Sequence, residues 1–589
     1  MRTCAKLQWR GAAGAPVLLL MLCLSAANVL FAQETRGTIL GRVLDPSGGV
    51  IPGVTVVVTN AETNVRNQTV TNDRGLFEIP LLMPGPYHVV AEQPGFKKHV
   101  REGITVSVNA RVNIDIVLEI GGTQETVTVT AETPLLETAT ASAGQVMDNK
   151  RVMELPVMGN SVMLMAGLNP GMQRGSYNYL GLHSTVGASD YNTAGGVGGN
   201  EWSIDGTPNS GHSRRNAILP YTDTIEEFRV ESASFDARLG HTTGASITMQ
   251  TKSGTNSYHG SATWSHWQQR WNATPNNDNG VYWKRIKDAE AAGNSALADQ
   301  LRSQPRQPTG RSNNYAASAG GPVRIPWLFN GKDRLFFFFS FNGFKDNKTE
   351  EAGNKLFSVP TVKERAGDFS EKLTVDPVRY QIYDPLSVRF NSATGIYERD
   401  PFPGNIIPST RFLNPMYKFY EKLYPLPNNP PQMNVDGGNN YFNGAIPFNW
   451  NYKAFMNRFD WIATTRDRFF VRWSYNKFVE DRNDWTYETA RWLHSNALNR
   501  IGKSGNVDWV HTFNPRTILN AAVAVNRYVD NDLRTEMLKY KPSDVGLPTY
   551  LDQKAADLHA LPILNFSNNY RQVSSGVTIP RPITTQTLK

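Results

Sequence analysis

The chain has almost no cysteine, no long apolar run beyond its start and no large excess of either charge. Its 589 residues include two cysteines, Cys4 and Cys23. A mature protein without this start has no disulfide, no thiolate metal site and no cysteine nucleophile. Lys and Arg total 60 against 52 Asp and Glu, dispersed without a basic block. This pattern indicates a solvated surface and argues against nucleic-acid binding.

The first 32 residues have the parts of a secretory signal peptide. Arg2, Lys6 and Arg10 precede an apolar run over residues 15–24, and small residues follow. The run is too short for a membrane-spanning helix, which needs about 20 residues. We therefore expect cleavage after Ala32. No later stretch reaches 18 consecutive apolar residues, which predicts no helical span but leaves a β-barrel open, because barrel strands alternate polar and apolar residues.

Residues 36–120 contain short strand patterns separated by Gly/Pro turns. The strand candidates are residues 39–45, 54–59, 76–79, 87–91, 104–108 and 112–118. Strands at this spacing predict a small β-sandwich. The phrases at 49–54, 71–77, 84–87 and 94–97 resemble the carboxypeptidase regulatory-like domain. The resemblance implies a transthyretin-like sandwich, of a kind grouped with carbohydrate-binding folds.

His99 and Glu102 in this segment have the spacing of two zinc ligands. A catalytic zinc site needs a third ligand and a positioned base. On a strand, these two side chains would also point to opposite faces. We therefore expect no metal site here. The ten histidines are scattered, and no nucleophile or phosphate-loop motif is convincing, so the sequence predicts neither catalytic residues nor a cofactor.

A Thr/Val segment lies in the linker that we expect over residues 121–139. It consists of Glu125, Thr126, Val127, Thr128, Val129, Thr130 and Ala131. Its β-branched residues favour a strand, and no nearby segment is an obvious partner, so its backbone would be free to pair with another protein. The segment resembles the TonB box of outer-membrane transporters, which implies a TonB-type energy-coupling protein as partner. A plain linker strand has the same composition.

Residues 140–256 carry five short motifs. They are a Leu-Pro at 155–156, an Asn-Pro-Gly at 169–171, the turn Asp205-Gly206, a strand at 225–230, and a glycine-spaced strand with Gly240, Gly244, Lys252 and Gly254. Each is weak alone, since Asp-Gly is a common hairpin turn. In this order they resemble the α+β plug domain of TonB-dependent receptors, where glycines would let strands pass closely inside a lumen. We also expect a helix over 145–155 and a loop over 171–200.

From residue 257 onward, aromatic and polar residues alternate. In the segment 468–478, Phe469, Val471 and Trp473 alternate with Arg472 and Ser474. Similar strands are expected at 335–341, 455–463, 505–513 and 519–526, with short turns at 464–467 and 514–517 and a long loop over 342–452. The alternation is typical of lipid-facing barrel strands with aromatic girdles. A soluble sandwich has the same period, but such a long loop is rare in one.

Phrases at 320–323, 330–338, 359–361 and 367–370 resemble Oar-like receptors, TonB-dependent receptors that begin with a carboxypeptidase regulatory-like domain. The resemblance implies a mostly β chain: the sandwich over 36–120, the plug over 140–256 and the first strands of an antiparallel transmembrane β-barrel over 257–589. About seven barrel strands are recognisable, where such transporters use about 22. With no closing aromatic strand before Lys589, we expect the N-terminal portion of a longer protein.

The expected function is TonB-driven uptake of an unidentified substrate, with carbohydrate and peptide both open. The resemblance implies a place in the outer membrane, with the first domain in the periplasm and with TonB and membrane lipid as partners. The alternative is a secreted or surface carbohydrate-binding adhesin in which the first domain binds the ligand. Neither reading predicts an enzyme, a metal or a nucleic-acid partner.

Overall fold

The computed structural model describes residues 34–122, 126–130, 143–155, 161–174, 191–193, 199–211, 216–234, 242, 244–274, 276–303, 306, 310–350, 355–411, 416–429, 438–443, 446–482, 496–531, 540–555 and 581–588. The predicted signal peptide lies outside these residues, as do Glu125, Ala131 and Gly240. Strands dominate the described part, which confirms the prediction of a mostly β chain.

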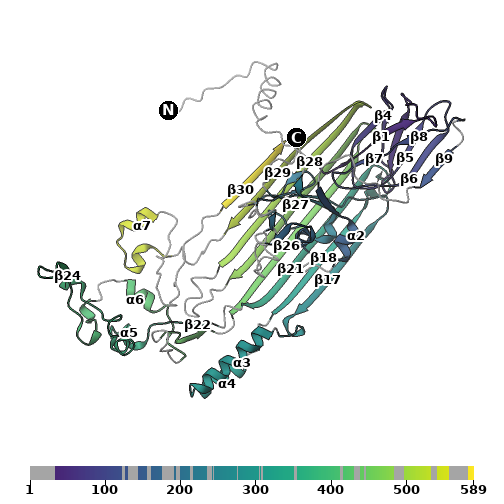
Figure 1. The fold of residues 1–589 in the computed structure, drawn as a ribbon. Coiled ribbons are helices and arrows are strands. Elements are labelled where there is room, and N and C mark those ends of the chain that lie inside the picture. The colour runs from purple at the N-terminus through teal and green to yellow at the C-terminus, as the bar shows by residue number, and fades with distance from the viewer. Residues whose placement is uncertain are drawn as a thin grey trace, which may run out of the picture.

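The first described residues form two sheets around one core (Figure 1, purple). One sheet has the order β4-β1-β7, with β8 also paired to β1, and the other has the order β3-β2-β5-β6-β9. Val56, Val58 and Val89 are fully buried between them, because alternate residues of each strand face the core. The strands are β1 (Gly37–Leu44), β2 (Thr55–Asn60), β3 (Arg66–Val70), β4 (Leu76–Leu82), β5 (Gly85–Glu92), β6 (Lys98–Val106), β7 (Arg111–Asn113), β8 (Ile116–Val117) and β9 (Thr126–Thr130).

A middle sheet follows, with the order β10-β15-β16-β13-β14. Its strands are β10 (Ala143–Met147), β13 (Glu201–Ile204), β14 (Thr207–Pro208), β15 (Ile225–Ser234) and β16 (Ser246–Thr251). Beside it lie the helix α2 (Asn149–Glu154), the 3₁₀ turns η2 (Val162–Leu168) and η5 (Thr222–Thr224), and the paired strands β11 (Met172–Arg174) and β12 (Tyr191–Thr193).

Two local predictions for the middle segment are wrong. The helix predicted over residues 145–155 begins only at Asn149, since residues 143–147 pair with β15 and the Asp148 carboxylate caps the helix by accepting from the Arg151 N–H. The loop predicted over 171–200 contains β11 and β12.

The main feature of the described residues from 259 onward is one antiparallel sheet of eight strands, in chain order from β17 to β30 (Figure 1). Its strands are β17 (His259–Gln268), β18 (Gly310–Pro322), β21 (Leu335–Glu350), β26 (Ile446–Ile462), β27 (Asp467–Arg482), β28 (Asn496–Asn514), β29 (Thr517–Asn531) and β30 (Arg581–Leu588). The Pro/Thr stretch near Lys589, where no strand was expected, supplies β30. The loop predicted over 342–452 is shorter, because β21 and β26 extend into it.

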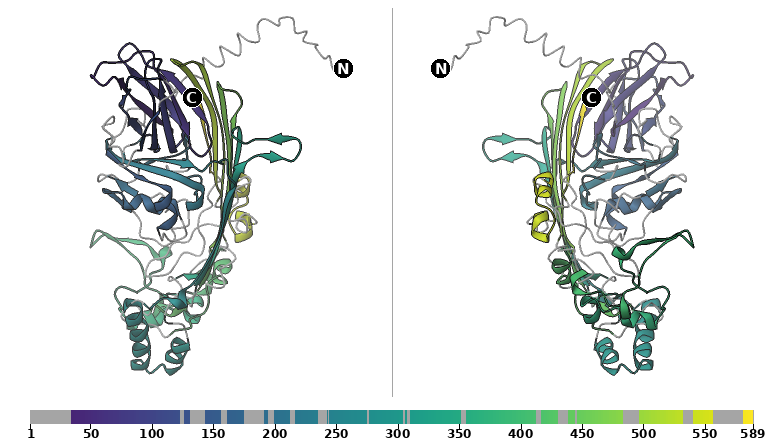
Figure 2. Two further views of the ribbon diagram at one scale, coloured as in Figure 1. Left: turned by 90° about the vertical axis from the view of Figure 1, so that its right-hand side faces the viewer. Right: turned by 90° about the vertical axis from the view of Figure 1, so that its left-hand side faces the viewer.

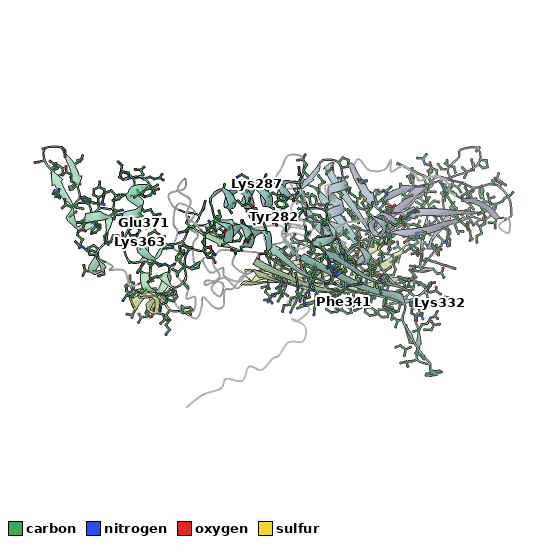
Figure 3. All side chains as sticks on the ribbon, turned by 90° about the horizontal axis from the view of Figure 1, so that it is seen from below. Tyr282, Lys287, Lys332, Phe341, Lys363 and Glu371 are labelled. Carbon is green, nitrogen blue, oxygen red and sulfur yellow. The ribbon has the colours of Figure 1, made fainter. Side chains whose placement is uncertain are left out.

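Connections are short at one end of this sheet and long at the other. The turns predicted at 464–467 and 514–517 join β26 to β27 and β28 to β29. The long connections carry α3 (Asn276–Ala291), α4 (Ser295–Ser303), β22 (Lys355–Phe357), α5 (Val362–Arg365), β23 (Arg389–Asn391), β24 (Ile396–Glu398), α6 (Met416–Glu421), β25 (Tyr441–Asn443) and α7 (Tyr550–Ala555). The loop between β21 and β26 carries exposed ion pairs such as Lys363–Glu371, at 2.6 Å (Figure 3).

The eight-stranded sheet buries polar side chains on one face and exposes apolar side chains on the other, the reverse of a soluble protein. One face packs on the middle domain and buries polar residues such as Arg472, Asn506 and Asn526, together with aromatics such as Trp450. The opposite face exposes large apolar side chains, including Phe459, Trp461, Val471, Trp473, Val507 and Val525. Trp473 is 46% exposed and Ser474 4%, as the sequence alternation predicts. No helix in the described ranges is long and apolar enough to cross a membrane.

Candidate functional site

The Thr/Val segment is an edge strand of the first domain. β9 pairs in parallel with β6, with Thr126 opposite Lys98 and Val129 opposite Arg101. The prediction that nothing nearby pairs with this segment is therefore wrong. The chain crosses to the other sheet through β7 and β8 before it returns, as parallel pairing requires. β9 ends the sheet order, so its outer edge is free of any strand in the described part.

Little side-chain burial holds β9 in place. Val127 is half-buried and Val129 is 40% exposed. The strand is five residues long and has one neighbour. A short edge strand with few apolar contacts belongs to the least stable parts of a fold, so it can detach without unfolding the domain.

Asp205 lies at the centre of a buried ion cluster between the middle domain and the large sheet. The Asp205-Gly206 turn joins β13 to β14, and both residues have positive φ, 48° and 74°. The Asp205 carboxylate accepts from the N–H and hydroxyl of Thr251, at 2.9 and 2.8 Å. It also lies 3.2 Å from Nη1 of Arg458 and 3.3 Å from Nε of Arg472.

Three neighbouring strands hold this turn. Arg458 lies on β26, Arg472 on β27, and Asn506 of β28 donates to the Asp205 carbonyl oxygen at 3.2 Å. The side chains of both arginines and of Asp205 are no more than 1% exposed. Arg458 has a second partner in Asp460, at 2.7 Å. Removing one member of such a cluster leaves a buried charge without its partner, which is strongly destabilising.

Three further residues of the predicted motifs, Gly244, Lys252 and Gly254, flank β16. Lys252 forms an ion pair with Asp223 at 3.3 Å, and Gly244 precedes β16. Gly254 lies against the large sheet, where a Cβ would come within 2.4 Å of the Phe337 carbonyl oxygen. Any side chain at Gly254 would therefore push the backbone away from β21.

The first domain is fastened to both of the other parts. Arg36 pairs with Glu34 at 2.7 Å and with Asp508 of β28 at 3.1 Å. The Thr35 hydroxyl donates to Gln250 of β16 at 2.7 Å. The Val108 N–H donates to the Glu227 carboxylate on β15, also at 2.7 Å. These contacts keep the domain at the short-turn end of the large sheet (Figure 2).

Glu227 makes this docking sensitive to pH. Burial raises the pKa of its carboxyl to about 7, although the hydrogen bond from the Val108 N–H lowers this pKa. Since the folded pKa lies above the unfolded one, Glu227 favours folding most below about pH 4.5, and this contribution is lost as pH rises to about 7. A shift of this size corresponds to roughly 3 kcal/mol. We expect the melting temperature of the wild type to fall between pH 4.5 and 7, and that of the Glu227→Gln variant to fall less. Equal falls in the two proteins would mean that Glu227 does not cause this pH dependence.

His99 and Glu102 do not come together. His99 is buried and Glu102 is exposed, so they face opposite sides of β6, as predicted. Within the described ranges, no three potential metal-ligating side chains form a group.

The family model described as "Outer membrane beta barrel domain" matches residues 250–588, more than half of the chain. The chain belongs to this outer-membrane family. A second model, described as "Carboxypeptidase regulatory-like domain", matches residues 38–119. The TonB-dependent transporter Oar of Myxococcus xanthus is 26% identical over 327 residues, which cover 53% of this chain and 27% of Oar. These matches confirm the predicted likeness to Oar-like TonB-dependent receptors and the predicted place in the outer membrane.

Solved structures of outer-membrane receptors also align with this Oar-like chain. The outer-membrane transporter YddB from Escherichia coli has 10% identity and a TM-score of 0.38, covering 66% of this chain and 39% of that one. The siderophore receptor PirA from Acinetobacter baumannii has 13% identity and a TM-score of 0.34, covering 69% and 42%. The chain thus spans well under half the length of these relatives.

Proposed function

We propose that the chain takes part in TonB-driven uptake across the outer membrane. In this proposal, residues 36–120 are a transthyretin-like sandwich, residues 121–139 a linker, residues 140–256 a plug, and residues 257–589 part of a transmembrane barrel. The observation that carries the proposal is β9. It is a Thr/Val strand at the open edge of the first domain, and residues 131–142 alone separate it from β10 of the middle sheet.

The sheet order indicates how a pull on β9 would reach the plug. Among the described residues, β10 is an outer strand of this sheet and pairs with β15 alone. At the other side of the same sheet, Asp205 is bound to two arginines of the large sheet. A pull would therefore separate β10 first, since this breaks one ladder, while the Asp205 side stays in place. Such partial unfolding would open a path without releasing the whole plug.

The position of the first domain supports a periplasmic location. The Thr69 hydroxyl donates to the Pro515 carbonyl at 3.3 Å, in the short turn between β28 and β29. In outer-membrane barrels the short turns face the periplasm and the long loops face outside. β9 would then lie in the compartment where an energy-coupling protein can add a strand to its free edge.

The substrate stays open between carbohydrate and peptide, and it would bind at the long loops and the plug. The adhesin alternative is not favoured, because the family match and the exposed apolar face both belong to an outer-membrane barrel. We propose no catalytic role, since the relatives reported above are transporters and receptors.

Binding of an isolated TonB C-terminal domain to the full-length protein in outer membranes tests the proposal. Val127→Pro removes a backbone N–H from β9 and prevents a regular ladder, so we expect binding to fall to background. Val127→Ile keeps the strand and should bind like the wild type. Deletion of residues 126–130 is a second variant with the same expected loss. Undiminished binding to the deletion variant would rule out β9 as the coupling strand.

A further inference from the structure

A small hairpin leaves the large sheet on its apolar side. Between β18 and β21, the strands β19 (Arg324–Ile325) and β20 (Phe329–Asn330) pair with each other and with no other strand of the described part. Figure 2 shows this hairpin projecting from the face opposite the middle domain. The Leu328 N–H donates to the Ile325 carbonyl at 3.1 Å and closes the turn at its tip. The hairpin is thus an ordered projection.

Its tip presents apolar side chains without cover. Trp327 is 105% exposed, Leu328 80% and Ile325 48%. Trp327 also has a φ of 60°, which is uncommon for a bulky residue and costs free energy. Water is a poor environment for such a cluster, and exposed apolar patches on folded proteins mark surfaces that contact something else.

The base of the hairpin coincides with one boundary of the apolar face. Leu335 at its base lies opposite Trp461, and Trp461, Phe469 and Trp509 form a row of stacked rings across β26, β27 and β28. Aromatic rows of this kind lie where the membrane meets water. The hairpin therefore leaves the sheet at the level of the interface on the short-turn side.

Basic residues mark the other boundary of the apolar face. Five exposed cations lie further along the same face on consecutive strands: Lys345, Lys453, Lys477, Lys503 and Arg527. Leu335 and Lys345 are ten residues apart on β21. That separation is about 33 Å along a strand and about 25 Å across a membrane after the usual tilt, which matches the height of an apolar band. Because the aromatic row lies on the short-turn side of the sheet, it marks the periplasmic boundary of this apolar band.

Polar contacts hold the hairpin base rigidly. The Asp333 carboxylate accepts from Asn64 of the first domain at 3.0 Å and from Asn256 at 2.6 Å. A Cβ on Gly331 would lie 2.5 Å from the Val323 carbonyl oxygen, so the two arms pass as closely as a glycine allows. Lys332, labelled in Figure 3, lies at this base. The tip therefore keeps a fixed direction relative to the sheet.

We propose that residues 323–334 are an interfacial anchor that inserts its tip into the periplasmic leaflet of the outer membrane. Trp327 and Leu328 would contact the upper acyl chains, since the hairpin continues the lipid-facing surface at interface level. The exposed cations Arg324, Lys332 and Arg334 would face phospholipid phosphates. Arg324 already lies 5.9 Å from the exposed Tyr258 ring, which keeps it beside the sheet. This role is independent of TonB.

An environment-sensitive fluorophore on a cysteine tests the anchor. The mature chain is expected to have no cysteine, so Trp327→Cys gives a single labelling site. The labelled full-length protein, with any cysteine outside these residues replaced by serine, is reconstituted into phosphatidylethanolamine–phosphatidylglycerol vesicles, with and without phospholipids brominated on the upper acyl chain. We expect blue-shifted emission at 327 and loss of most of its intensity with the brominated lipid.

Two further sites serve as controls. A label at Trp473→Cys, on the apolar face of the sheet, should be quenched and shows that the chain has inserted. A label at Arg74→Cys, exposed on the first domain, should emit as in water. The proposal fails if the 327 label behaves like the Arg74 label while the 473 label is quenched. It also fails if the shift at 327 occurs in native membranes and not in vesicles, because the tip would then bind a protein.

Discussion

Asp205→Asn is expected to loosen the middle domain from the large sheet. The asparagine keeps the shape of the turn and tolerates its positive φ, but it leaves Arg458 with one carboxylate partner and Arg472 without one. Breaking a buried ion pair by removing one partner costs about 3–5 kcal/mol. We expect a lower urea midpoint for protection of residues 143–251 against protease, with the large sheet still inserted.

Asp333→Asn is the matched control. Asp333 also has positive φ, at 62°, but it is exposed, so the same substitution should cost less than about 1 kcal/mol. Adding Arg472→Met to Asp205→Asn should restore part of the lost stability, because the unpaired charge is removed as well. If the double variant is no more stable than Asp205→Asn, the loss does not come from the unpaired arginine.

Trp473→Arg is expected to impair insertion of the large sheet. Trp473 lies on the apolar face, midway between Phe469 of the aromatic row and Lys477 of the basic row, and its ring stacks on Phe459 at 5.7 Å. A charged side chain near the membrane midplane costs roughly 2–4 kcal/mol, and this cost falls to about 0–1 kcal/mol near the interface. We expect a large fall in the amount of chain that resists urea extraction from outer-membrane fractions.

Phe513→Arg is a control that distinguishes the effect of membrane depth on an added charge from the effect of losing an aromatic ring. Phe513 is 52% exposed and lies beside the short turn after β28, outside the aromatic row. It also contacts a neighbouring ring, that of His511, at 4.4 Å. The substitution is chemically similar, but it places the charge close to water. Equal extraction of the two variants would mean that the exposed apolar face does not lie in the bilayer.

Much of the fold follows from local sequence patterns. Alternation predicts the faces of β27, β28 and β29, because successive side chains on a strand point to opposite sides whatever surrounds them. The Pro/Thr sequence of β30 lacks the aromatic pattern and does not predict a strand; these residues are extended because they pair with β29. The helix prediction for residues 145–147 is wrong for a similar reason, because pairing with β15 outweighs their local helix preference.

The candidate site could be predicted in part. Composition predicts that residues 126–130 are extended, but β6 as their partner depends on a crossover through another sheet. Alternation places Arg472 on the inner face of its strand, and a buried charge there demands a partner. The identity of that partner, Asp205, follows from contacts between segments more than 250 residues apart. No local pattern carries such information.

The attachment of β9 to β6 gives the first domain a mechanical role. In the proposed function, a pull on β9 has to break two strand pairings in succession. The first is the five-residue ladder between β9 and β6, and the second is the pairing of β10 with β15. The first domain is itself fixed by Arg36 and by the Val108–Glu227 hydrogen bond, so it resists the tension instead of moving with it. The twelve residues 131–142 can span at most about 43 Å, which limits how far β9 can move before the pull acts on β10. A brief or weak pull would not break the ladder between β9 and β6, and only a sustained pull would displace the plug.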